Sequence, residues 1–417
     1  MNGRLVKVAD MTPAELEAWA ALAAGAVEPN PVFEPACLLP ASRYLPRGRD
    51  ITLVVAEDGG QMHGCFPVLE VGLDARPSTS FRGVFRPAYT TQVRRNRYDG
   101  TPLLRSEKGV AAARAMLEAL AEAGRHPHSR PAGPGLLVLE SLRTEGPVWG
   151  SLAAAACMLR VPAVVHHSYP RPVANRRSDG NYLSHHSKKS RYNWARAGRQ
   201  LGERLGGEPA LVDCSHDPVA VERLLDMEAA GYKARTTGRR RDASPGESTG
   251  RGGATLLHPG EPAWFKEMCD QYRAGGRLVV QALQVLDQIV AMQLSVRAGN
   301  GVYLLATVYD EKYSAQSPGA VLAVRAMQEV FGDDRVDFMD TCTYEGNDGL
   351  LRLYPDRRQV SCVVLATGGL VDRTALQAYE TARRLAGAGS PLRSSHRFAR
   401  LVDRFSDNLH PKRGASG

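Results

Sequence analysis

The residues best suited to hold a charged ligand form a turn of small side chains between an apolar strand and a helix. The run from Val302 to Val308 is β-branched, aromatic and aliphatic, which is typical of a buried strand. A helix is predicted to begin near Pro318, with Ser317 as its cap. Backbone N–H groups and the positive end of the helix dipole would then favour a phosphate at Gln316–Val321. An ordinary capped helix would show the same pattern.

Two carboxylates and two tyrosines near this turn could transfer protons. Asp337 and Asp340 lie in an apolar strand predicted over residues 335–341, where limited access to solvent would raise the pKa of a carboxyl group. They are three residues apart and therefore point to opposite faces. Asp340, nearer the strand end, is the predicted base, and Asp337 is expected to pair with an arginine. Tyr309 and Tyr313 are the predicted proton donors. Structural acids and packing tyrosines are the alternatives.

Other charged side chains suggest contacts with a substrate. Arg357 and Arg358 could bind a phosphate or carboxylate through paired N–H groups, although a turn stabilised by arginines explains them equally well. Glu228 and Lys233 lie five residues apart across a predicted helix end and could instead be a surface pair.

Several classes of site are excluded by spacing. The pairs His166-His167 and His185-His186 lack the spacing and partner acids of a metal site, so no metal is predicted. The seven cysteines are scattered and never form Cys-x-x-Cys, so we expect them to be reduced and mostly buried. The absence of Gly-x-Ser-x-Gly argues against a serine hydrolase.

The elements that position these residues predict a mixed α/β fold in two halves. The predicted divisions are a first half at 1–167, a linker at 168–180, a second half at 181–388 and a basic tail at 389–417. Strands at 277–285, 288–298 and 301–309 are expected to form a meander that leads into the turn. Arg235–Gly253 is nearly free of apolar residues and is interpreted as a lid or a disordered loop.

The composition indicates a globular protein that attracts anions. The chain has 417 residues, 43% of them hydrophobic, and a formal net charge of +9. Coenzyme A, carrier proteins and tRNA are all anionic partners that would suit this charge, although a high arginine content alone would also explain it. No apolar run reaches the ~18 residues of a membrane helix, and the N-terminus lacks an apolar signal core. A cytoplasmic location is therefore expected.

Four stretches of the second half resemble the GNAT acyltransferase superfamily, and more narrowly the CelD/BcsL-type acetyltransferase-like proteins. They are the basic helix 187–201, Glu228 with Gly231-Tyr-Lys233, the strand–turn–strand that begins at Arg277, and Tyr309-Asp310 with Ser317-Pro-Gly319. The resemblance covers about residues 180–340. Tyr232 and Ala234 replace the family's Trp and Gly. Pro318 and Val321 depart from its phosphate loop, which makes binding of coenzyme A by that loop weaker than in a typical member.

The resemblance implies tandem GNAT-like halves, each a mixed and mostly antiparallel sheet flanked by helices, with a degenerate first half. It implies an N-acyltransferase that uses acyl-CoA or an acyl carrier protein as co-substrate, has no tightly bound cofactor, and holds the acyl carbonyl with a backbone N–H at about Thr307–Tyr309. The implied catalytic residues are Asp340, Tyr309, Tyr313 and Glu228. Those implied to bind the acyl donor are Val308, Gln316, Ser317, Gly319 and Ala320. Those implied to bind the substrate are Lys233, Asp337, Arg357 and Arg358.

Two other functions are compatible with the same residues. The family is related to the Fem peptidyltransferases, which use aminoacyl-tRNA, and the basic helix 187–201 and Arg239-Arg-Arg241 would suit tRNA. A non-catalytic binding protein with a degenerate phosphate loop is the other alternative, supported mainly by Val321.

Overall fold

The structure is a computed structural model that describes residues 1–71, 87–93, 98–124, 134–180, 182–231, 254–345 and 348–387. The predicted loop Arg235–Gly253, Lys233 and the predicted tail 389–417 lie outside the described residues. Within these ranges, no helix has enough length and apolar character to cross a membrane.

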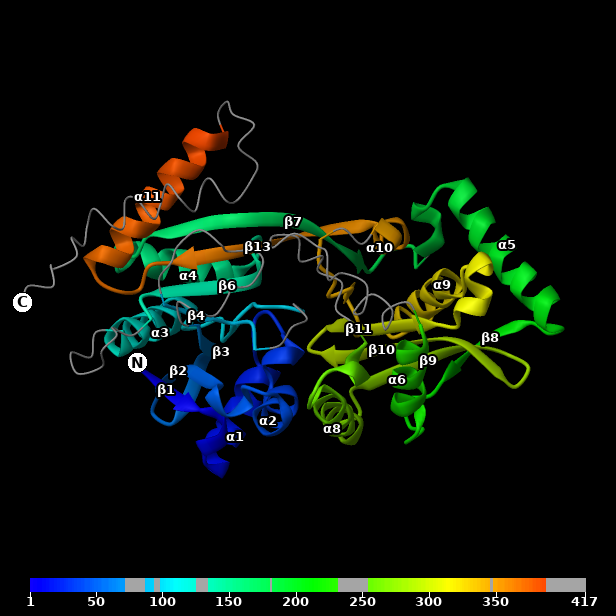
Figure 1. Ribbon diagram of the computed structural model, residues 1–417, viewed down its shortest axis with the longest axis horizontal. Coiled ribbons are helices and arrows are strands. Elements are labelled where there is room, and N and C mark those ends of the chain that lie inside the picture. Colours follow the sequence, from blue (N-terminus) through cyan, green and yellow to red (C-terminus); the bar gives the residue numbers. More distant parts are fainter. Residues whose placement is uncertain are drawn as a thin grey trace, which may run out of the picture.

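Among the described residues, thirteen strands form one sheet, and Figure 1 labels most of them. They are β1 (Asn2–Lys7), β2 (Thr52–Asp58), β3 (Gln61–Val71), β4 (Ala88–Thr90), β5 (Leu103–Leu104), β6 (Leu136–Arg143), β7 (Ala163–Asn175), β8 (Pro209–Asp213), β9 (Leu278–Val285), β10 (Gln288–Ala298), β11 (Gly301–Tyr309), β12 (Phe338–Asp340) and β13 (Asp356–Leu365). Their order is β1-β2-β3-β4-β6-β13-β7-β12-β11-β10-β9-β8, and β5 pairs with β3 outside this path. The predicted meander is confirmed as β9, β10 and β11.

The helices flank this sheet. They are α1 (Pro13–Ala24), α2 (Pro35–Tyr44), α3 (Gly109–Ala123), α4 (Pro147–Met158), α5 (Lys188–Leu205), α6 (Ala220–Ala230), α8 (Glu261–Ala274), α9 (Pro318–Val330), α10 (Asp348–Leu353) and α11 (Leu370–Gly387). Local sequence signals explain several of their ends. Thr12 and Glu15 form a reciprocal capping box before α1, and Pro318 occupies the first position of α9, where a missing N–H costs no hydrogen bond.

The two halves of the sheet repeat one plan. In the first half, antiparallel strands lead to β4, and α3 then returns the chain to β6, which lies parallel to β4. In the second half, the β8–β11 strands lead through α9 to β12, which lies parallel to β11. This arrangement confirms the predicted fold class, a mixed and mostly antiparallel sheet flanked by helices.

The two halves are joined by an exchange of strands at the centre of the sheet. β7 and β13 pair with each other, and β13 also pairs with β6 (Figure 1). On its other side β7 pairs with β12, a strand of the other half. The predicted linker 168–180 therefore coincides with β7 as far as Asn175. Proline-rich sequence there resembles a turn, yet Pro170 and Pro172 sit in register with β13. The residue bounds of the predicted division, 1–167, 168–180, 181–388 and 389–417, remain a prediction.

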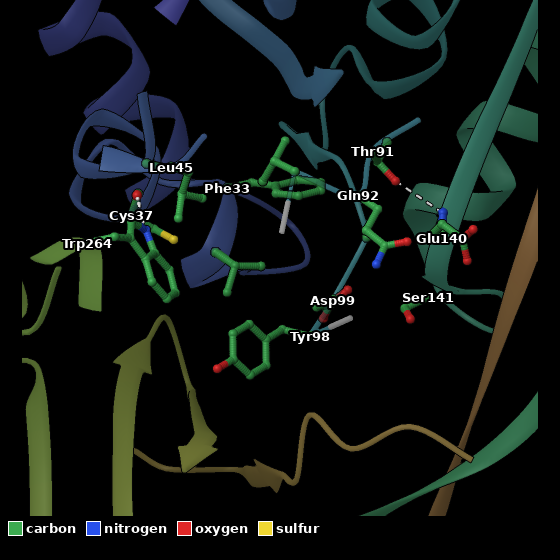
Figure 2. Close-up of a pocket in the computed structure, with 14 residues that line it drawn as sticks. Phe33, Cys37, Leu45, Thr91, Gln92, Tyr98, Asp99, Glu140, Ser141 and Trp264 are labelled. Atoms are coloured by element: carbon green, nitrogen blue, oxygen red, sulfur yellow. Dashed lines mark hydrogen bonds between the residues drawn. The ribbon is translucent and has the colours of Figure 1, made fainter. Parts of the chain in front are cut away.

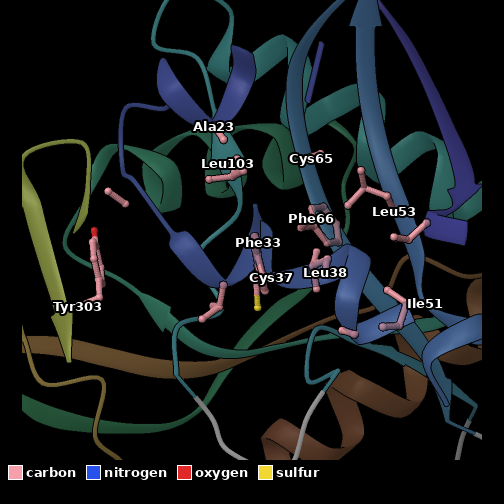
Figure 3. Close-up of a cluster of buried hydrophobic side chains, with 14 of the residues drawn as sticks. Ala23, Phe33, Cys37, Leu38, Ile51, Leu53, Cys65, Phe66, Leu103 and Tyr303 are labelled. Atoms are coloured by element: carbon pink, nitrogen blue, oxygen red, sulfur yellow. The ribbon is translucent and has the colours of Figure 1, made fainter. Parts of the chain in front are cut away.

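The main hydrophobic core also crosses between the halves. Figure 3 shows the part of it around Phe33, Leu38 and Phe66, with Tyr303 of β11 beside it. Trp264 of α8 belongs to the same cluster and donates from its indole N–H to the carbonyl oxygen of Cys37, at 3.1 Å. Six of the seven cysteines are buried and Cys157 is exposed, which confirms the prediction that they are mostly buried.

Candidate functional site

The backbone of β11 is the first component of the candidate site. Its pairing with β12 ends at Tyr303 opposite Asp340, while its pairing with β10 continues to Tyr309. The β10–β11 register shifts next to Leu304 and Ala306, which makes Leu305 the extra residue of a β-bulge. The bulge therefore lies just beyond the point where two parallel strands separate. Bulges re-aim backbone groups, so this segment can present an N–H to a ligand placed between the strands.

A tyrosine from the first half holds the bulge. The hydroxyl group of Tyr98 donates a hydrogen bond of 3.3 Å to the carbonyl oxygen of Leu305. Tyr98 also lines a hollow of about 40 Å³, whose walls include Phe33, Thr91 and Glu140 (Figure 2). That volume suits a few water molecules or a small chemical group. The first half therefore contributes directly to the surroundings of the bulge.

The turn after β11 differs from the predicted capped helix. A short 3₁₀-helix, Glu311–Gln316, leads to Ser317, which has a left-handed backbone at φ 46° and ψ 52°. The prediction that Ser317 caps α9 is wrong, because its side chain makes no capping hydrogen bond. Capping side chains normally project from an extended backbone, and the left-handed conformation redirects this one. Its carbonyl oxygen instead accepts the N–H groups of Ala320 and Val321, at 2.9 and 3.2 Å.

The residues predicted to bind the acyl donor lie along this turn. Gly319 lies against the ring of Tyr309, since a Cβ added to Gly319 would be 3.4 Å from Tyr309 Cδ1. Val308 is buried, while Ala320 is half-buried at the start of α9. Gln316 accepts a hydrogen bond of 3.0 Å from Arg204 Nη1 of α5.

Tyr313 occupies a packed position rather than an open one. Only 8% of its surface is exposed, and it belongs to a hydrophobic cluster with Leu201 and Leu322. Its hydroxyl oxygen accepts a hydrogen bond of 2.9 Å from Gln288 Nε2, and the guanidinium of Arg204 lies 5.1 Å from its ring centre. Of the two predicted proton donors, Tyr309 is therefore the better placed to meet a ligand.

Asp340 is fully buried within a group of arginines. Its carboxylate lies 2.8 Å from Arg358 Nη1 and 3.8 Å from Arg171 Nη1, and it accepts a hydrogen bond of 2.8 Å from the N–H of Cys342. Burial opposes the charged form, but Arg171, Arg358 and Arg143, together with the Cys342 N–H, hold the pKa of Asp340 below its ordinary value. The predicted rise of its pKa is wrong, because the strand's apolar neighbours are outweighed by cations from other strands.

A second buried ion pair ties β11 to the first half. Arg143 of β6 donates from Nε to Asp99 Oδ2 at 2.7 Å and from Nη2 to the hydroxyl of Tyr303 at 3.1 Å. Tyr303 in turn donates to the carbonyl oxygen of Pro29 at 2.6 Å. Tyr98, Asp99, Arg143 and Arg171 were not predicted as site residues. Their charges and hydroxyl form no local pattern, so only the sheet pairing brings them to the site.

Three predicted residues lie apart from the bulge. Asp337 precedes β12 at the end where β11 begins, and its carboxylate accepts a hydrogen bond of 2.6 Å from Asn300 Nδ2 rather than pairing with an arginine. Arg357 donates to backbone carbonyls of Leu351, Tyr354 and Asp356, as expected for an arginine that stabilises a turn. Glu228 is buried and accepts the N–H of Thr255 at 2.8 Å.

Comparison with known proteins supports the GNAT resemblance. Residues 188–348 match a family described as an acetyltransferase (GNAT) domain. This segment runs from α5 past β12 and contains the bulge, the turn and α9. No curated protein sequence matches the chain.

Solved structures share the fold over most of the chain. FemX is 8% identical with a TM-score of 0.53, covering 88% of this chain and 97% of FemX. A conserved protein of unknown function from Bacteroides thetaiotaomicron is 15% identical with a TM-score of 0.50, covering 86% of this chain and 98% of its own. A tandem GNAT protein from the clavulanic acid biosynthesis pathway is 15% identical with a TM-score of 0.41, covering 88% and 98%. At these identities the similarity to FemX and to the Bacteroides thetaiotaomicron protein concerns the fold alone.

Proposed function

We propose that this protein is an N-acyltransferase that moves an acyl group directly from a thioester, acyl-CoA or an acylated carrier protein, to an amine. One observation carries the proposal: the Leu305 bulge lies where β11 separates from β12, and α9 begins at the end of the following turn. The GNAT match of residues 188–348 supports acyl transfer as the reaction. The narrower kinship with CelD/BcsL-type proteins rests on the motifs Tyr309-Asp310 and Ser317-Pro-Gly319.

For this acyl transfer the protein mainly needs to position the two substrates and to stabilise the charge that develops on the carbonyl oxygen. The amine nitrogen bonds to the acyl carbon, the carbon–sulfur bond breaks, the amine loses a proton and the departing thiolate gains one. A backbone N–H of the β11 segment from Leu305 to Tyr309 would bind the carbonyl oxygen as its negative charge grows. Tyr309, beside Gly319 at the start of α9, would donate the proton to the thiolate.

Asp340, the predicted base, is poorly placed to accept the proton of the amine. Asp340 is fully buried, and Arg358 and Arg171 hold it in its charged form. A carboxylate with a lowered pKa is a weak base, and this one has no exposed surface. We therefore assign Asp340 a structural role in stabilising β12. The amine would lose its proton to water, or would bind in its neutral form.

The Fem-like reading is the second candidate function. The fold similarity to FemX and the cations of α5 would suit an aminoacyl-tRNA donor. The same bulge would then bind the carbonyl of an aminoacyl ester. A non-catalytic binding protein remains the third candidate, because α9 begins with a proline that offers no N–H.

Donor binding separates these candidates. Thermal-shift and thiol-release measurements with a panel of acyl-CoAs and acylated carrier proteins should show stabilisation and turnover with one of these thioesters. Salt-sensitive binding of aminoacyl-tRNA without any response to thioesters would favour the Fem-like function. If none of the three donors binds or reacts, the non-catalytic binding protein is the remaining candidate.

A matched pair of glycine variants tests where the donor binds. Gly319→Val adds branches beside Tyr309, whereas Gly150→Val in α4 adds them where no atom lies within 4 Å of the new Cβ. We expect Gly319→Val to raise KM for the thioester by about tenfold or more, about 1.4 kcal/mol of lost binding, and Gly150→Val to leave KM unchanged. Equal KM values for the two variants would remove the turn from the donor site.

A further inference from the structure

Helix α5 carries a stripe of cations on its exposed face. Its exposed basic residues include Lys188, Lys189, Arg196 and Arg199. On a helix of 3.6 residues per turn these four positions fall within about 100° of one another, with Tyr192 between them. Tyr192 is 59% exposed. We call this surface the α5 stripe.

The cations of the α5 stripe lack the usual internal partners. Among the described residues, none of the four forms an ion pair with a carboxylate, whereas Arg177 before the helix and Arg223 after it pair with Asp356 and Asp217. Lys188 and Lys189 also occupy the first turn of α5. Cations at that end oppose the helix dipole, so the folded protein gains nothing locally from placing them there. Both features favour an external anionic partner.

An apolar groove lies beside the stripe. α5 and α9 enclose a volume of about 680 Å³. Its lining combines the apolar side chains of Trp194, Val321 and Val324 with Arg199 of the stripe. Glu203 and Glu208 also line it. An apolar floor with a cationic rim suits an amphipathic acidic helix of a protein, whose apolar face can fill the floor, better than a phosphodiester chain, which has no apolar face to place there.

The groove leads to the candidate donor site. The first residue of α9 that lines the groove is Val321, at the end of the Gln316–Val321 turn predicted to bind the acyl donor. Arg204 of α5 donates a hydrogen bond to Gln316, at the other end of the same turn. The turn itself offers few donors to a free nucleotide. Pro318 has no N–H, and the N–H groups of Ala320 and Val321 are bonded to Ser317. Much of the binding energy for the acyl donor is therefore expected from contacts outside the turn.

We propose that the α5 stripe and the groove dock an acidic, helical carrier protein that presents its acyl thioester on a flexible arm to the β11 bulge. This inference rests on the proposed acyltransferase function and names the donor's class. Attraction between the stripe and the acidic carrier speeds encounter, and the apolar groove holds the complex. The arm then reaches past Gln316 to the separation of β11 and β12.

The test measures binding of the full chain to a fluorescently labelled acyl carrier protein whose phosphopantetheine arm is acetylated. Arg196→Glu combined with Arg199→Glu should raise Kd by about tenfold or more, and higher salt should weaken the wild type in the same direction. Arg49→Glu is the control, because Arg49 is also exposed but lies outside α5. It should change Kd less than twofold. Far-UV circular dichroism and the urea midpoint of each variant establish that it is folded.

The outcomes separate this inference from the proposed function. Thiol release from acetyl-CoA by a protein that does not bind the carrier, or that binds it equally well after charge reversal, would overturn the docking inference alone. If the protein releases no thiol from either acetyl-CoA or the acetylated carrier, the proposed function is overturned. A hairpin RNA that binds through Arg196 and Arg199 while the carrier does not bind would also overturn the inference and identify the stripe as a nucleic-acid surface.

Discussion

Replacing Asp340 by asparagine should destabilise the protein rather than only slow its reaction. Arg358 and Arg171 are opposite each other in the register of β13 and β7, and Asp340 is the carboxylate that lies between their charges. Asparagine keeps the shape of the side chain but removes its charge. The buried guanidinium of Arg171 and the partly exposed one of Arg358 would then face each other without compensation. Breaking a buried pair in this way costs about 3–5 kcal/mol.

The measurement is the free energy of unfolding in urea. A loss of about 4 kcal/mol reduces the ratio of folded to unfolded protein by about a thousandfold and lowers the urea midpoint at a constant slope. Asp58→Asn is the control, since Asp58 forms an exposed pair with Lys108 and its loss should leave the midpoint unchanged.

The pH dependence of stability tests independently whether the charged Asp340 stabilises the fold. Its folded pKa is below the unfolded value of about 3.9, so the charged carboxylate stabilises the protein above that pH. This stabilisation is lost as the pH falls through the lower, folded pKa. The wild type should therefore lose stability in acid more steeply than Asp340→Asn.

One result would refute this reasoning. If Asp340→Asn unfolds at the same urea concentration as Asp58→Asn, the arginines do not depend on the carboxylate. Loss of turnover in such a stable variant would restore Asp340 as a catalytic base. Loss of stability with proportionate loss of activity supports the structural role.

Three further predictions follow from named contacts. Tyr98→Phe removes the hydrogen bond to Leu305 and should lower kcat with the thioester donor while costing only about 1 kcal/mol in urea unfolding; an unchanged kcat would show that Tyr98 does not position the bulge. Tyr303→Phe removes the hydroxyl shared by Arg143 and the Pro29 carbonyl, which still bond to each other at 2.9 Å, and should therefore cost only about 1 kcal/mol in the same assay, whereas an unchanged midpoint would mean that this hydroxyl does not stabilise the fold. Burial, with Arg383 and His167 nearby, lowers the pKa of His166 to about 4, below the unfolded value of about 6.5, so stability should fall as the pH decreases between these values. His166→Gln should flatten that part of the urea-midpoint profile, and an unaltered slope would contradict the assignment.

Local elements of the fold follow from the sequence by itself. The meander of β9, β10 and β11 and the start of α9 at Pro318 were both predicted, because each depends on residues that are close together along the chain. The GNAT resemblance likewise rests on consecutive motifs, and the matched segment 188–348 agrees with it. The candidate donor turn therefore could be located before any coordinates were known.

Only the tertiary structure decided what surrounds that turn. Arg171, Asp340 and Arg358 come from three separate strands, and they meet because β7 pairs with both β12 and β13. The exchange of β7 and β13 between the halves is not encoded in any local periodicity. The pKa of Asp340 depends on these distant cations and not on its apolar neighbours in the strand, which explains the error in its predicted direction. The contact of Tyr98 with the Leu305 bulge is decided in the same way, by packing of one half against the other.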